Sequence, residues 1–251
     1  MLTYRTYLRL PELLGLQSPA GPGSTDERLF IVAHQVCELW FMLMLDALEE
    51  TRGRLLARDL HGARRRLARV VSLQRLQLAQ VELLETMSPR EFASFRGSLG
   101  SASGLQSAQY HEVEYLSGAR DPAYLRRAQW LSAGERERLE RRLAEPSVWD
   151  GYLRALQSRG LAVDSAQQVA ASVAATAADE SAYGDLWAVA EDLRTYDSLA
   201  AVWRLRHAQL AERYIGTAEG TGGSRGAAYL RGQINRRYFP LLGPLDPHEC
   251  Q

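Results

Sequence analysis

Apolar residues recur every three or four positions over long stretches of this chain, the spacing that places them on one face of an α-helix. The clearest stretch covers residues 186–215. Its apolar face is made of the following residues: Leu186, Val189, Leu193, Tyr196, Leu199, Trp203, Leu210 and Tyr214. His207 lies four residues after Trp203 and three before Leu210, so the pattern puts its imidazole on that buried face. Gly216 follows directly and predicts the end of the helix.

A second long helix is predicted from about residue 27 to residue 56, with Thr25 or Asp26 available to cap it. One stripe of this helix contains Phe30, His34, Cys37, Phe41, Met44 and Leu48. Residues 29–45 (LFIVAHQVCELWFMLML) are apolar nearly all round, which predicts burial on most sides. A buried imidazole such as that of His34 costs free energy unless it forms a hydrogen bond or binds a metal.

The remaining pattern also predicts helices, and no segment alternates with the period of two that indicates a strand. Expected helices cover residues 60–86, 89–96 with Ser88 as cap, 105–116, a short one from Pro122, 132–143, 146–158 and 165–178. Residues 166–178 are rich in alanine and offer little to a core, so we expect a surface connection there. Residues 4–16 predict a weak helix or an extended arm. The chain is therefore expected to be all-α, one helical bundle domain over residues 1–251 with an N-terminal arm at 1–17.

Composition narrows the class of protein. Thirty basic and thirty acidic residues give a net charge of zero, which argues against a nucleic-acid partner. Two cysteines, Cys37 and Cys250, make no disulfide framework. The N-terminus lacks the pattern of a signal peptide, and no uninterrupted apolar run reaches about eighteen residues. We therefore expect a cytoplasmic protein without a membrane partner.

Three features carry candidate chemistry: the two helical histidines, Arg96 beside the small-residue loop 97–104, and the glycine-rich loop 220–224. A neutral imidazole can ligate iron, loop N–H groups can receive anions, and an arginine can bind a carboxylate bidentately. Ordinary readings remain open at this point: a core histidine with its own partner, a simple turn, and an ion pair of Arg96 with Glu85 or Glu91. A zinc site on His34 and His207 would lack a third ligand.

Taken together, four segments resemble the tryptophan 2,3-dioxygenase family of haem enzymes. They are LTYRTYLRL at 2–10, DERLFIVAHQVCELW at 26–40, LETMSPREFASFRGSLGSASGLQSAQY at 84–110 and VWRLRHAQLAERYIGTAEGTGGSRGAAYL at 202–230. Their order and spacing match the family, whereas similarity fades over residues 119–185, which we expect to be a variable helical connection. The resemblance implies a helical domain that encloses haem b. It also implies that the protein is a homotetramer.

The resemblance also implies a role for individual residues. His207 would be the axial ligand of the haem iron, and His34 the distal histidine that meets the indole N–H and takes part in catalysis. Phe30 and Phe92 would line the indole pocket, and Arg96 and Thr221 would hold the amino-acid groups. Residues expected near the haem are Ser103, Gly104 and Gly220. Residues expected to reach a neighbouring subunit's site are Tyr4, Tyr7 and Leu8.

The implied reaction uses dioxygen as co-substrate and opens the indole C2–C3 bond of L-tryptophan, or of a substituted tryptophan, to give N-formylkynurenine. Four positions depart from the family pattern: Thr25, Met42, Leu105 and His111 stand where histidine, lysine, phenylalanine and a basic residue are usual. These departures leave open a relative that monooxygenates a tryptophan derivative to an oxindole. A non-catalytic haem-binding or haem-sensing protein is a further alternative, although a sensor has no use for a complete amino-acid clamp.

Overall fold

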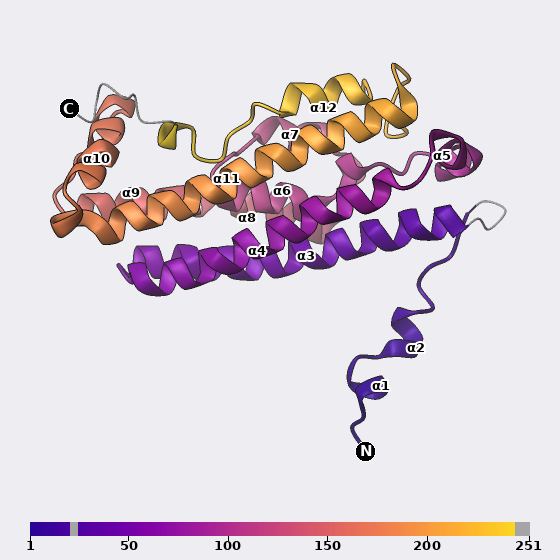
Figure 1. Ribbon diagram of the computed structural model, residues 1–251, viewed down its shortest axis with the longest axis horizontal. Helices are drawn as coiled ribbons and strands as arrows, with labels where there is room; N and C mark the ends of the chain where they lie inside the picture. The colour runs from indigo at the N-terminus through magenta and orange to yellow at the C-terminus, as the bar shows by residue number, and fades with distance from the viewer. Residues whose placement is uncertain (21–24, 244–251) are drawn as a thin grey trace.

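The computed structural model describes residues 1–20 and 25–243, which contain helices and no strand, so the predicted all-α class is confirmed. Three long helices run side by side along the molecule: α3 (Thr25–Leu56), α4 (Leu60–Glu85) and α11 (Glu180–Ile215) (Figure 1). Helix α4 packs against both α3 and α11. Helix α11 begins six residues earlier than the pattern predicted. It ends at Gly216, whose φ of +55° is strained for other residues.

Shorter helices complete the bundle. Their bounds are α5 (Pro89–Arg96), α6 (Ala108–Ser117), α7 (Pro122–Arg127), α8 (Ala133–Ala144), α9 (Val148–Ser158), α10 (Ala166–Ala178) and α12 (Ala227–Gln233). The predicted start of α5 is confirmed by a capping box. The Ser88 hydroxyl accepts from the backbone N–H of Glu91, and the Glu91 carboxylate accepts from the backbone N–H of Ser88. Helix α12 was not predicted. Thr25 and Asp26 lie within the first turn of α3 rather than before it.

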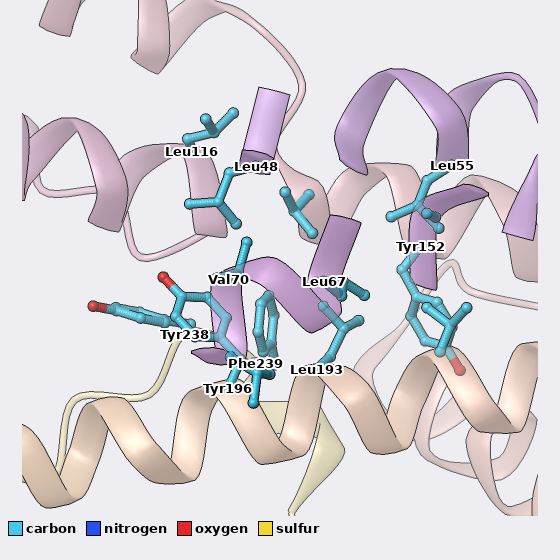
Figure 2. Close-up of a cluster of buried hydrophobic side chains, with 14 of the residues drawn as sticks. Leu48, Leu55, Leu67, Val70, Leu116, Tyr152, Leu193, Tyr196, Tyr238 and Phe239 are labelled. Carbon is cyan, nitrogen blue, oxygen red and sulfur yellow. The ribbon is translucent and has the colours of Figure 1, made fainter. Parts of the chain in front are cut away.

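Two clusters of buried side chains hold the bundle together. The larger joins α3, α4, α6, α9, α10 and α11 with the segment after α12, and Figure 2 shows its centre: Leu48, Leu55, Leu67, Val70, Leu116, Tyr152, Leu193, Tyr196, Tyr238 and Phe239. The smaller lies at the other end of α3 and contains Ala33, Val81, Leu84, Met87, Phe92, Phe95 and Leu210. Because both draw on α3, α4 and α11, the long helices are fixed at both ends.

Helix α10 is not the surface connection that its composition suggested. Val169, Ser172, Val173 and Thr176 are buried, and both valines belong to the larger core cluster. The helix packs on α11 and on the 3₁₀ turn Pro240–Leu242. Alanine's small side chain allows this close approach, which residue-by-residue hydrophobicity does not reveal.

Helix α3 is long and apolar enough to cross a membrane, judged by length and composition alone. Its most apolar window is only 22% buried. Core helices of proteins that do not span membranes pass the same test, and α3 supplies residues to both core clusters. The expectation of no membrane partner therefore stays a prediction.

The N-terminal arm stands away from the bundle (Figure 1). It carries two one-turn helices, α1 (Tyr4–Tyr7) and α2 (Leu10–Leu13), neither of which has a buried residue. Its link to the bundle is polar: the Gln17 amide donates to the side-chain oxygen of Gln35, and the Gln35 amide donates to the carbonyl of Leu16. An arm with this much exposed tyrosine and leucine surface has no core of its own.

The burial of α10 gives a direct test. Val173→Asp should lower the free energy of unfolding by about 3 kcal/mol or more, because it places an unpaired carboxylate in the core. Ala171→Asp, on the exposed side of the same helix, is the matched control and should cost about 1 kcal/mol or less. Urea denaturation of both variants measures the difference in the free energy of unfolding. Equal losses of stability in the two variants would contradict the burial of α10.

Candidate active site

A cavity of about 280 Å³ lies between α3 and α11. It is bordered also by α4, α5, α6 and α12, and by the two small-residue loops, 97–104 and 220–224. It brings together nine of the residues singled out from the sequence: Phe30, His34, Phe92, Arg96, Ser103, Gly104, His207, Gly220 and Thr221. The other three, Tyr4, Tyr7 and Leu8, are exposed on the arm and do not line it. The cavity is bordered by both core clusters, through Phe41 of one and Phe92 of the other.

His207 projects into this cavity from the apolar stripe of α11. Burial, with a smaller contribution from nearby His34, lowers the pKa of His207 to about 4. The imidazole is therefore neutral near pH 7 and has a lone pair to offer. Its ring stacks on Trp203, one turn earlier, with 5.3 Å between centroids. Among the described residues no hydrogen bond to the His207 ring is found, so the reading of a core histidine with its own partner is not supported.

His34 enters the cavity from α3. Its Nδ1 lies 2.7 Å from the Phe30 carbonyl oxygen, which can only accept, so the ring proton belongs on Nδ1 and Nε2 keeps a lone pair. Burial lowers the pKa of His34, against smaller opposing effects of the Phe30 carbonyl and Glu38. A neutral imidazole with a free Nε2 is suited to accept a hydrogen bond from an N–H in the cavity.

Aromatic rings form the wall beside His34. The Phe30 ring lies 4.1 Å from the His34 ring and 5.8 Å from that of Phe92, measured between centroids. Tyr214 of α11 stacks on Phe92 at 4.9 Å, and its hydroxyl donates to backbone carbonyls at the end of α4. The wall is therefore a packed apolar surface of the kind that accommodates a flat aromatic ligand.

Arg96 has no acidic partner among the described residues. One guanidinium nitrogen donates to the backbone carbonyl of Glu219 at 2.6 Å. The alternative of an Arg–Glu ion pair is wrong. Glu85 forms an ion pair with Arg206, and the Glu91 carboxylate accepts from the backbone N–H of Ser88. A cation held only by a neutral carbonyl at a cavity can still bind a carboxylate strongly.

The two small-residue loops dock on each other above the cavity. The Thr221 hydroxyl donates to the carbonyl of Ala102. A Cβ on Gly222 would lie 2.7 Å from the Cβ of Ser103, so only glycine permits this approach. The N–H of Gly220 donates to the carbonyl of Ser224, within the loop itself. That amide is therefore occupied, and a ligand would meet Gly220 through other atoms.

A polar end of the cavity was not found from the sequence. The Nε1 of Trp203, the Nε and Nη1 of Arg204 and the Nε2 of His111 are buried, and no described residue is a hydrogen-bond partner of any of these atoms. All three side chains line the cavity. Arg204 lies three residues before His207, so its charge on the buried face of α11 was a readable signal.

The charges around the Trp203 and Arg204 donors favour an anion. The Nε2 of a neutral His111 ring is an acceptor, because its Nδ1 donates to Glu114. Arg204 and Arg236 both lie near the carboxylate of Glu114, which is 2.9 Å from His111 Nδ1 and 3.4 Å from Arg236 Nη1. Buried donors without partners cost free energy, which a ligand carboxylate would recover. Of the four departures from the family pattern, Leu105 and His111 line the cavity, whereas Thr25 and Met42 do not.

Cys37 also lines the cavity, and burial with the nearby Glu38 raises the pKa of its thiol to about 12. It is therefore protonated and is no metal ligand in this state. Among the described residues no group of three or more His, Cys, Asp or Glu side chains is arranged to hold a metal ion. Cys250 lies outside the described residues. A metal bound here would need ligands beyond the protein's own.

Comparison with known proteins places these features in a family. The sequence model described as "Tryptophan 2,3-dioxygenase" matches residues 1–167 and 136–242, which together include the 119–185 segment where similarity was expected to fade. Proteins named tryptophan 2,3-dioxygenase from a Nocardioides species and from Herpetosiphon aurantiacus are 46% and 42% identical to this chain. Each comparison covers 96% of this chain, and 92% and 96% of the two relatives. A relative of the same name from an Anaeromyxobacter species is 38% identical over 96% of this chain.

Proposed function

This chain belongs to the tryptophan 2,3-dioxygenase family, and on that basis we propose that it is an enzyme that oxygenates tryptophan in the cavity between α3 and α11. The observation that carries the proposal is the pair of neutral histidines in one cavity, together with an arginine, Arg96, that has no acidic partner in the part of the chain that the structure describes. One imidazole is available to a metal and the other to an N–H. The arginine is available to a carboxylate.

We propose haem b as the cofactor, with His207 as the axial ligand. The residues present fit this group in two ways: the unprotonated imidazole of His207 has no competing partner among the described residues, and the unpaired donors of Trp203 and Arg204 suit carboxylate acceptors such as haem propionates. Ser103, Gly104 and Gly220 would contact the group where the two loops meet. When bound, ferrous haem would supply the reactivity toward dioxygen, the co-substrate.

The protein's own residues would bind and orient the amino acid. Arg96 would exchange the Glu219 carbonyl for the substrate carboxylate, and the Thr221 hydroxyl would meet the ammonium and carboxylate groups. Phe30 and Phe92 would pack on the indole ring and exclude water from it. The Nε2 of His34 would accept the indole N–H, which fixes the rotation of the ring and hence the position of C2 and C3.

L-tryptophan or a substituted tryptophan, opened to N-formylkynurenine, is the preferred reading over two alternatives. A haem sensor would not need Arg96, Thr221, His34 and Phe30 around one cavity. Monooxygenation to an oxindole is favoured only by Leu105 and His111, the two departures that border the cavity. Neither residue displaces a proposed ligand or substrate contact.

We also propose a homotetramer. Large apolar side chains are exposed on two helices that pack against each other: Val32, Leu39, Met42 and Leu43 on α3, and Leu76 and Leu83 on α4. The arm adds Tyr4, Tyr7 and Leu8, which we expect to reach a neighbouring subunit's cavity. Further copies of the chain would cover both surfaces. The cytoplasmic location stays a prediction.

The assembly can be weighed in solution. Sedimentation should give about four times the 28.1 kDa mass of one chain. Met42→Glu should shift the protein toward smaller species, because it places charge on the apolar surface, whereas Arg126→Glu, on the exposed side of α7, should not. A fully active monomer, or partition into lipid vesicles, would contradict the tetramer.

The axial ligand is tested by haem content. His207→Ala should purify with little haem because its ligand is lost, and free imidazole should restore part of the haem absorption. His34→Ala should retain haem, since that side chain is proposed to meet the substrate and not iron. Absorption spectra of the purified variants measure both. Normal haem in His207→Ala, or loss of haem in His34→Ala alone, would reverse the assignment.

The reaction itself is tested by product mass under isotopically labelled dioxygen. With L-tryptophan and no added reductant beyond that needed to reduce the iron, the product should carry two labelled oxygen atoms, as N-formylkynurenine does. A product with one labelled atom, formed only with a continuing supply of ascorbate, would make the enzyme a monooxygenase. No product, with haem bound normally, would favour the sensor.

A further inference from the structure

Gln80 of α4 contacts α3 on both sides of His34. Its amide nitrogen donates to the carbonyl of Ala33 at 3.1 Å, and its amide oxygen accepts from the Cys37 thiol at 3.4 Å. Ala33 precedes His34, and Cys37 follows it by about one turn. The Gln80 side chain therefore spans the turn that carries His34, and it does so at the wall of the cavity.

Two further amides tie down the same part of α3. Gln77, fully buried one turn earlier on α4, donates to the carbonyl of Cys37 at 3.2 Å. Gln109 of α6 donates to the carbonyl of Glu38 at 3.1 Å and to its carboxylate at 2.8 Å. Carbonyls inside a helix already accept the N–H four residues on. Three of them here, within six residues, receive a second donor from outside the helix.

The position of the His34 ring depends on this backbone. Its Nδ1 is bonded to the carbonyl of Phe30 in the same helix, so the ring turns and shifts with the turn that carries it. No other hydrogen bond to the ring is found among the described residues. The Cys37 thiol can serve as a lasting donor, because burial keeps its proton on.

We propose that Gln80, bridging Ala33 and the Cys37 thiol, is a positioning residue that directs the Nε2 of His34 toward the substrate N–H. The inference rests on the proposed function, since it takes the substrate to be an indole whose N–H meets His34. A competing view is that Gln80 only strengthens the packing of α4 on α3. The two views differ in whether the effect of Gln80 passes through His34.

The test is a double-mutant cycle read as substrate preference. Gln80→Met keeps the length of the side chain and removes both hydrogen bonds. The quantity measured is the ratio of kcat/KM for L-tryptophan to kcat/KM for 1-methyl-L-tryptophan, which lacks the N–H. Gln80→Met should lower this ratio by about tenfold, the factor that one hydrogen bond can contribute. In a His34→Ala background it should change the ratio less than about twofold, because there is no imidazole left to position.

Two controls separate positioning from stability. Thr51→Val removes another buried side-chain bond on α3, from the Thr51 hydroxyl to the carbonyl of Ala47, far along the helix from His34. It should reduce thermal stability without moving the ratio. Should Gln80→Met fold poorly, Cys37→Ala and Cys37→Ser take its place: alanine removes one bond of the bridge and should lower the ratio, and serine keeps a donor and should restore most of it.

The outcomes are distinct. A ratio unchanged in Gln80→Met, or lowered equally with and without His34, overturns the proposal. A wild-type protein that does not oxygenate tryptophan defeats the proposed function instead. In that case ¹⁵N spectra of histidine-labelled protein test whether Gln80 positions the His34 ring. The His34 signals are assigned as those that are lost in His34→Ala. Ring signals that shift in Gln80→Met support the bridge, and unshifted signals overturn it.

Discussion

The site depends on keeping two imidazoles uncharged in one enclosed space. Both rings are buried, so a proton on either ring would be poorly solvated, and a charge on His34 would also repel one on His207. The all-helical frame makes this possible. Long helices α3 and α11 satisfy their own backbone groups, so their facing side chains can be apolar apart from the few groups that act. Shorter elements would leave backbone donors and acceptors to compete for the histidines.

Polar groups around the cavity are divided by task. On α3, backbone carbonyls accept the Nδ1 proton of His34 and the glutamine amides, so the backbone of this wall is held by several hydrogen bonds. At the other end, Trp203 and Arg204 keep donors that have no partner among the described residues. A hydrogen-bonded wall favours rigidity, whereas unpaired donors favour a bound acceptor. The contrast indicates that the α3 wall positions a group of the protein, His34, whereas the end near Arg204 is suited to bind a ligand.

Much of this arrangement is legible in the sequence, for specific reasons. Helical spacing placed His34 and His207 on buried faces, and Ser88 with Pro89 marked the start of α5, because these features depend on near neighbours in the chain. The burial of α10 and the existence of α12 were missed, because small residues pack by shape and not by hydrophobicity. The hydrogen-bond partner of Arg96 and the Gln80 bridge could not be predicted from the sequence either. Each joins segments far apart in sequence through single hydrogen bonds, which leave no periodic signal.

The neutral partner of Arg96 has a consequence for selectivity among similar molecules. A guanidinium already paired with a carboxylate would gain little by exchanging one anion for another. Arg96 instead gives up a carbonyl, and a charged acceptor binds about twice as strongly as a neutral one. If Arg96 receives the substrate as proposed, indole and decarboxylated amines such as tryptamine would compete poorly, because they offer nothing better than the carbonyl already in place. The cavity could then discriminate against breakdown products of its own substrate without any steric barrier.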